Sequence, residues 1–112
     1  MTRDGWLVSK GNVLASAQHA TSHKDRGRGL LGRTGIDGAL VLENTRWVHT
    51  IGMKFAIDVA HLDADGKVLR IARMQPNRVG PYVRHAARVV EAEAGAFARW
   101  GLHLDDVVEL RE

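Results

Sequence analysis

One histidine and one aspartate stand close together in an otherwise apolar part of the sequence. His49 lies within the segment WVHTI at residues 47–51, and Asp58 lies between Ile57 and Val59. A histidine titrates near neutral pH and can act as a base, an acid, a ligand or a hydrogen-bond donor. Burying an unpaired aspartate costs on the order of several kcal/mol. We therefore expect Asp58 to have a partner.

Three partners for Asp58 are available: His49, Arg33 of the segment GLLGR at residues 29–33, and backbone amides of the chain between them. They leave two interpretations open. In one, Asp58 is the centre of a structural network, and His49 is a core histidine bonded to a backbone carbonyl. In the other, Asp58 orients His49 as a base and Arg33 holds an anionic substrate.

The strongest turn signal is Asp63-Ala64-Asp65-Gly66, which separates two short aliphatic segments at residues 57–62 and 67–74. Asp and Gly at these positions are typical of a β-hairpin, in which glycine supplies a positive φ. A calcium loop requires further ligands at set spacings, which are missing. Asp63, Asp65 and Gly66 are therefore assigned to a structural turn.

The remaining pattern predicts a mainly β chain with one or two short helices. Strands are expected at residues 6–8, 13–15, 38–42, 88–92 and 107–110, and a helix at residues 94–100 that Gly101 ends. Ser22 could cap a second short helix, and five glycines between residues 27 and 38 make long regular structure improbable. A single domain over residues 1–112 is expected, and an antiparallel β domain is the simplest interpretation.

Composition excludes several classes of site. The chain has no cysteine, and therefore neither a disulfide nor a thiolate metal site. No segment approaches the roughly 18 apolar residues of a membrane span, and the first residues do not form a signal peptide. We expect a cytoplasmic protein. His19 and His23 would share one face of a helix, but no third ligand beyond Asp25 is evident, so no metal and no cofactor are expected.

Positive charge is concentrated in the second half of the chain. Between residues 66 and 90 the charged residues are all basic: Lys67, Arg70, Arg73, Arg78, Arg84 and Arg88. One interpretation is a solvated surface partly neutralised by the six acids of residues 91–112. The other is a basic surface for an anionic ligand or a nucleic acid.

The motifs at residues 29–33, 49–58 and 63–66 together resemble the family known as domain of unknown function 192. Its pattern combines a Gly-Leu-x-Gly-Arg element, a (His/Asn)-Thr-x-x-Met-x-x-x-x-Asp core and an Asp-x-Asp-Gly hairpin, and the resemblance covers about residues 28–110. Arg33, Thr50, Met53 and Asp58 match this pattern. The resemblance implies a β-sandwich of jelly-roll type, so the expected fold is a single antiparallel β-sandwich or a partly closed barrel. The resemblance brings no established activity.

Three functions remain open. The leading one is a small cytoplasmic ligand- or partner-binding domain with a pocket around His49, Thr50, Met53 and Asp58, where Arg33 would contact a small anionic ligand. The alternative is a small acid–base enzyme acting on an anionic substrate, with the catalytic residues unassigned. A nucleic-acid-binding module using the arginines of residues 67–88 is a second, less favoured alternative.

Overall fold

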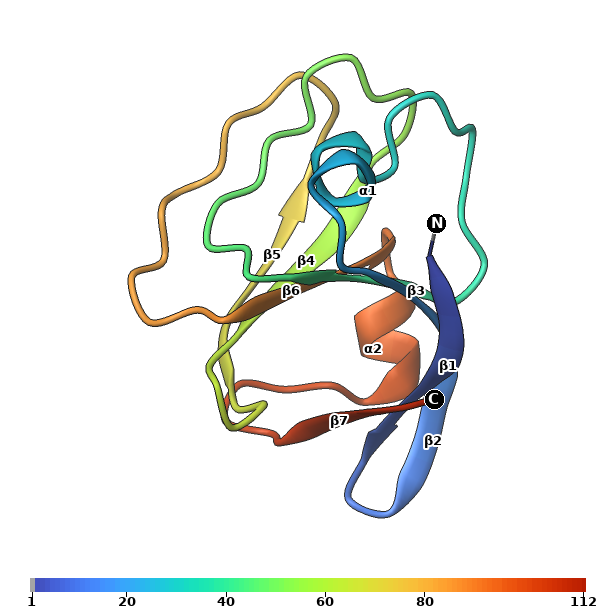
Figure 1. The fold of residues 1–112 in the computed structure, drawn as a ribbon, viewed down its shortest axis with the longest axis vertical. Coiled ribbons are helices and arrows are strands. Elements are labelled where there is room, and N and C mark those ends of the chain that lie inside the picture. Colours follow the sequence, from blue (N-terminus) through green and yellow to red (C-terminus); the bar gives the residue numbers. More distant parts are fainter. Residues whose placement is uncertain (1) are drawn as a thin grey trace.

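The computed structural model describes residues 2–112, which form seven strands and two short helices (Figure 1). The strands are β1 (Arg3–Ser9), β2 (Asn12–Ala20), β3 (Ala39–Glu43), β4 (Ile57–Leu62), β5 (Val68–Met74), β6 (Arg88–Glu93) and β7 (Val108–Arg111). The helices are α1 (His23–Arg28) and α2 (Ala96–Trp100).

All seven strands are joined in one sheet with the order β5-β4-β6-β3-β2-β1-β7. Five of the six neighbouring pairs are antiparallel, and β2 and β3 are parallel. A parallel pair needs a crossover connection, and here residues 21–38 supply it, with α1 lying across one face of the sheet (Figure 1). The expectation of a wholly antiparallel arrangement is therefore wrong at this pair, because the glycine-rich segment is a crossover.

The sheet curls until its two edges approach each other at one corner. Lys67, next to β5, forms an isolated bridge with Val107, next to β7, and the Val108 amide donates to the Gly66 carbonyl at 2.8 Å. The expectation of a mainly β fold with two short helices is confirmed, and the sheet is a half-barrel. The narrower expectation of a jelly-roll sandwich is not confirmed, since all seven strands belong to one sheet.

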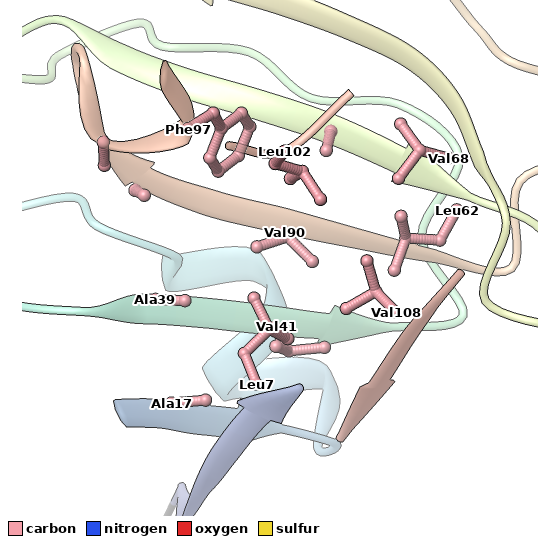
Figure 2. Packing of buried hydrophobic residues seen from close by; sticks show 13 residues of the cluster. Leu7, Ala17, Ala39, Val41, Leu62, Val68, Val90, Phe97, Leu102 and Val108 are labelled. Atoms are coloured by element: carbon pink, nitrogen blue, oxygen red, sulfur yellow. The ribbon is translucent and has the colours of Figure 1, made fainter. Parts of the chain in front are cut away.

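Each face of the sheet carries its own apolar core. On β4, Ile57 and Val59 point into one core while Ala60 and Leu62 point into the other, as alternation along a strand requires. The core that contains α2, which we call the α2 core, is shown in Figure 2 and includes Leu7, Val41, Leu62, Val90 and Phe97. The second core, which we call the α1 core, includes Leu30, Leu40, Val48, Met53, Ile57 and Val89.

Several element boundaries differ from those expected. β2 extends to Ala20, well beyond the predicted residues 13–15, because no glycine interrupts it after Gly11. His19 is consequently on a strand, where its ring nitrogens contact Glu43 Oε2 and Glu112 Oε1, each at 2.7 Å. His19 and His23 therefore do not share a helix face. The expected cap of α1 is present, since Ser22 Oγ accepts the Asp25 amide at 3.1 Å.

Asp58 connects β4 to the start of α2. Its carboxylate is buried, with 5% of the residue exposed. Oδ2 accepts the Gly95 amide at 3.0 Å and the Phe97 amide at 3.2 Å, and Oδ1 accepts Arg73 Nε at 3.2 Å. These amides are among those that a helix leaves without a partner at its N-terminus. Gly95 has φ +93°, outside the range of a right-handed helix, so the helix begins at Ala96 and not at residue 94.

The turn at Asp63–Gly66 connects β4 to β5. Asp63 Oδ1 accepts the amides of Asp65 and Lys67 at 2.9 Å each, and the Gly66 amide donates to the Asp63 carbonyl at 3.0 Å. Gly66 has φ +86°, and a Cβ there would overlap the Val108 carbonyl oxygen. Both the turn and the closure of the half-barrel therefore require glycine at this position.

Replacing Asp58 with alanine should lower the free energy of unfolding by about 2–4 kcal/mol, because the Gly95 and Phe97 amides lose their acceptor. Urea unfolding measures the change. Asp58→Asn, which retains an acceptor oxygen of the same shape, should lose less. A loss below about 0.5 kcal/mol for the alanine variant, the size typical of surface sites, would refute this role of Asp58.

Gly66→Val should destabilise the protein by at least about 2 kcal/mol, because the strain of a positive φ and the overlap with the Val108 carbonyl act together. Gly11→Val is the matched control, since Gly11 has φ +77° but open space around it. Thermal unfolding should show a clearly larger loss at Gly66. Equal losses at the two positions would mean that backbone strain alone matters and that the Val108 contact can relax.

Candidate functional site

A pocket of about 170 Å³ opens on the face of the sheet that α1 covers. Leu42 of β3 and Glu91 of β6 form its floor, and its walls come from residues 26–31 and from the loop at residues 45–53. Most of the wall is apolar, through the side chains of Leu30, Leu31, Trp47, Val48, Ile51 and Met53. We call this the α1 pocket.

Thr50 fixes the loop that forms one wall of the α1 pocket. It is completely buried, and its hydroxyl donates to the Gln75 carbonyl at 2.6 Å and accepts the Arg78 amide at 3.0 Å. The Thr50 amide also donates to the Arg78 carbonyl at 2.8 Å. Thr50 thus attaches the loop at residues 49–53 to the loop at residues 75–78, and this attachment positions His49 and Met53 on either side of it.

His49 lies at the mouth of the α1 pocket, exposed to solvent. Its Nδ1 accepts the Ile51 amide at 3.2 Å, and its ring lies 5.3 Å from the Trp47 ring, centroid to centroid. Because Nδ1 is an acceptor, the neutral imidazole carries its hydrogen on Nε2. His49 can therefore donate a hydrogen bond from Nε2 to a molecule bound at the mouth.

Glu91 is the buried charged group of the α1 pocket, with 3% of the residue exposed. Within residues 2–112 no donor contacts its Oε1. Burial raises the pKa of Glu91 to about 7, and the positive charge of Arg33 partly offsets that rise. Oε1 lies beneath Gly29, where an added Cβ would stand 3.5 Å from it. The floor of the pocket thus presents a carboxyl group that changes charge near neutral pH.

The structure brings together only part of the predicted site. His49 and Met53 line the α1 pocket, and Thr50 holds the loop between them. Arg33 does not line the pocket; its Nη2 donates to Gln18 Oε1 at 3.0 Å. Asp58 points into the α2 core on the opposite face of the sheet, so the pairing of His49 with Asp58 is not formed.

Sequence reasoning missed Glu91 and His61. Each stands in an apolar run, Val89-Val90-Glu91-Ala92 and Ala60-His61-Leu62, which is the same signal that singled out Asp58. His61 is 1% exposed, and within the described residues neither of its ring nitrogens has a hydrogen-bond partner. Burial, together with the charge of Arg70, lowers the pKa of His61 to about 4.

Three of the six basic residues between positions 67 and 88 have separate acidic partners. Arg73 contacts Asp58 at 3.2 Å and Arg88 contacts Glu43 at 3.1 Å. Lys67 lies 3.6 Å from Asp105, so one of the C-terminal acids does neutralise part of this segment. These contacts divide the positive charge among different parts of the surface.

Residues 2–112 hold no group of three His, Cys, Asp or Glu side chains suited to a metal ion. The same part of the chain also contains no helix that is long and apolar enough to cross a membrane.

The pKa shifts of Glu91 and His61 have opposite effects on stability. Glu91 has a higher pKa in the folded protein, about 7 against an ordinary 4.5, so its contribution is fully present below pH 4.5 and is lost as the pH rises to 7. His61 has a lower pKa when folded, about 4 against 6.5, so its contribution is present above pH 6.5 and is lost as the pH falls to 4. As the pH rises from about 4 to about 7, the contribution of His61 to stability therefore increases while that of Glu91 decreases.

Glu91→Gln should therefore stabilise the protein at pH 8 by about 2–3 kcal/mol, because it removes a buried negative charge and retains the shape of the neutral acid. Near pH 4.5 the variant and the wild type should be similar. Urea unfolding between pH 4.5 and 8 measures both effects. Glu93→Gln, on the same strand but exposed, should change stability by less than about 0.5 kcal/mol. A Glu91→Gln variant less stable than the wild type at pH 8 would contradict an unpartnered carboxylate.

Two solved structures share this fold. A protein of unknown function from Novosphingobium aromaticivorans DSM 12444 aligns with a TM-score of 0.79 and 18% identity, over 96% of this chain and 84% of that one. A "putative transcription regulator" from Sinorhizobium meliloti 1021 aligns with a TM-score of 0.81 and 21% identity, over 98% of this chain and 94% of that one. At these identities the likeness shows the fold alone.

No curated protein matches the sequence closely enough to count as a relative. The model of the DUF192 family, described as "Uncharacterized ACR", matches residues 6–110. That match covers nearly the whole chain, including the motifs at residues 29–33, 49–58 and 63–66. The protein therefore belongs to the DUF192 family, whose function is not established.

Proposed function

We propose that this protein binds a small ligand in the α1 pocket. The observation that carries the proposal is Glu91, a buried carboxyl group whose Oε1 has no donor within the described residues and which forms part of the floor of an apolar pocket. Clefts with mostly apolar walls and a few polar groups are the usual form of a ligand site.

The stability cost of Glu91 supports a functional role. A carboxylate held in apolar surroundings without a donor lowers the stability of the fold at neutral pH, and a glutamine or an apolar residue would avoid this cost. Groups whose pKa is shifted by burial and which lie in a cleft are frequent at functional sites. A structural carboxylate in this chain, that of Asp58, is by contrast bonded to three donors.

The mouth of the α1 pocket offers apolar surface as well. Leu31, Trp47 and Ile51 line the pocket and remain 41%, 45% and 53% exposed. Single exposed apolar side chains are common, but three around one opening form a surface that a ligand can cover. His49 Nε2 supplies a polar group beside them.

Acid–base catalysis is the second candidate. It is favoured by one observation: a carboxyl group with a pKa of about 7 and a histidine line the same pocket. A general acid or base works best when its pKa is near the operating pH. Turnover of a bound compound, lost in both Glu91→Gln and His49→Gln, would distinguish this function from binding alone.

The binding proposal is tested with a library of small amines, alcohols, carboxylates, phosphates and nucleotides. Of the three tryptophans Trp6, Trp47 and Trp100, only Trp47 lines the α1 pocket, so ligands should shift the indole N–H signal of Trp47 in NMR spectra. Trp6 and Trp100 serve as internal controls. We expect His49→Gln to weaken such a ligand by about tenfold, the effect of one good hydrogen bond, while thermal stability stays close to that of the wild type.

Other outcomes would change the proposal. Compounds that bind but leave the Trp47 signal unmoved would place the binding surface elsewhere. Short oligonucleotides that bind with an affinity falling steeply with salt would instead support the basic residues at positions 67–88 as a nucleic-acid surface. Equal binding to the wild type and to His49→Gln would remove His49 from the site.

A further inference from the structure

The inference drawn here rests on the proposed function and concerns the chemistry of the ligand. We infer that the α1 pocket binds a protonated amine carried on a small apolar body, with the ammonium group donating to Glu91. This inference is based on the floor of the pocket, where Glu91 offers an acceptor oxygen, Oε1, without a donor among apolar side chains.

The ligand must supply a donor. An ionised carboxylate has acceptor oxygens only, and Oε1 of Glu91 receives no hydrogen bond from residues 2–112. The neighbouring lining residues Leu30, Leu42 and Met53 have no donor in their side chains. A bound molecule that lacks an N–H or O–H group would leave the carboxylate both buried and unpaired, which is the most costly arrangement.

A cationic donor satisfies Glu91 better than a neutral one. A hydroxyl group provides a hydrogen bond but leaves the buried negative charge in place, whereas an ammonium group provides both the hydrogen bond and the opposite charge. Charge-assisted hydrogen bonds are roughly twice as strong as neutral ones. The indole of Trp47 in the wall is also a favourable neighbour for a cation.

Three arginines lie near the pocket, and other contacts or solvent take up part of their charge. Arg26 lines the pocket but is turned to backbone carbonyls, with Nη1 at 3.2 Å from the Glu43 oxygen and 3.3 Å from the Asn44 oxygen. Arg28 also lines the pocket, and its exposure to solvent weakens its interaction with a charge at the floor. Arg33 donates to Gln18 Oε1 outside the pocket lining, and its charge offsets only part of the effect of burial on Glu91.

The glycine above Glu91 leaves room for the donor. A Cβ on Gly29 would stand 3.5 Å from Oε1, in van der Waals contact with it, so glycine at this position keeps a side chain away from the buried carboxyl group. Gly27 adds a second wall position without a side chain. With a volume of about 170 Å³, the pocket fits one compact apolar group and its amine.

Three probes of the same shape test the inference: benzylamine, benzyl alcohol and benzoate. At pH 8 an alkylammonium group stays protonated, since amines of this kind titrate near pH 10. Each probe is titrated while the indole signal of Trp47 is followed. We expect benzylamine to bind on the order of tenfold more tightly than benzyl alcohol, the ratio that one charge-assisted hydrogen bond supplies, and benzoate to bind least.

Glu91→Gln provides the decisive comparison. The variant should lose the preference for benzylamine while its affinity for benzyl alcohol stays within about twofold of the wild type, because glutamine removes the charge and preserves the shape. Glu93→Gln, which removes an exposed charge from the same strand, should keep the preference.

The outcomes separate the two proposals. Equal affinities for amine and alcohol in the wild type, or a preference that survives Glu91→Gln, would overturn the inference and leave ligand binding at Trp47 intact. If none of the three probes moves the Trp47 signal, the inference is also overturned. If the wider library also leaves that signal unmoved, the proposed function is overturned as well.

Discussion

The burial of the central strands on both faces of the sheet is the constraint on which the rest of this structure depends. Every residue of β4 is buried, as are four consecutive residues of β6. A polar side chain on these strands has no access to bulk water, so it must find a partner within the protein or lower the stability of the fold. Three titratable residues face this choice: Asp58, His61 and Glu91.

The three residues meet the constraint in different ways, and each outcome has a structural consequence. Asp58 obtains three donors and thereby attaches α2 to the sheet. His61 remains neutral at physiological pH, because burial lowers its pKa to about 4. Glu91 is different, since at a pKa of about 7 it is partly ionised at neutral pH and its Oε1 has no donor within the described residues. Glu91, which keeps a partial negative charge in the buried sheet, is also the residue of the three that lines a pocket.

The sequence predicted most strands, the hairpin turn and the burial of Asp58, because each depends on a local pattern of side chains. It also predicted that Asp58 has partners, but the partners are Arg73 and the amides of Gly95 and Phe97, none of which was among those expected. It did not predict the parallel pairing of β2 and β3 or the residues that converge at the pocket. Alternation along a strand predicts that neighbouring side chains point to opposite faces of the sheet, but it does not predict which helix covers which face. Met53 and Asp58 are five residues apart in one motif, and yet the chain between them turns so that Met53 packs in the α1 core and Asp58 points into the α2 core.

This division also changes how the family motif is interpreted. Thr50 and Asp58, which match the pattern, make structural contacts in this protein: Thr50 joins two loops, and Asp58 accepts backbone amides at the start of a helix. Only His49 and Met53 of the core motif line the α1 pocket, where they meet Glu91 from a strand outside the motif. A motif that is contiguous in sequence is therefore not one site. Asp58, on the α2 face, has three donors, whereas Oε1 of Glu91, on the α1 face, has none within the described residues. The ligand site proposed for this protein is therefore on the α1 face, where a ligand can supply the missing donor.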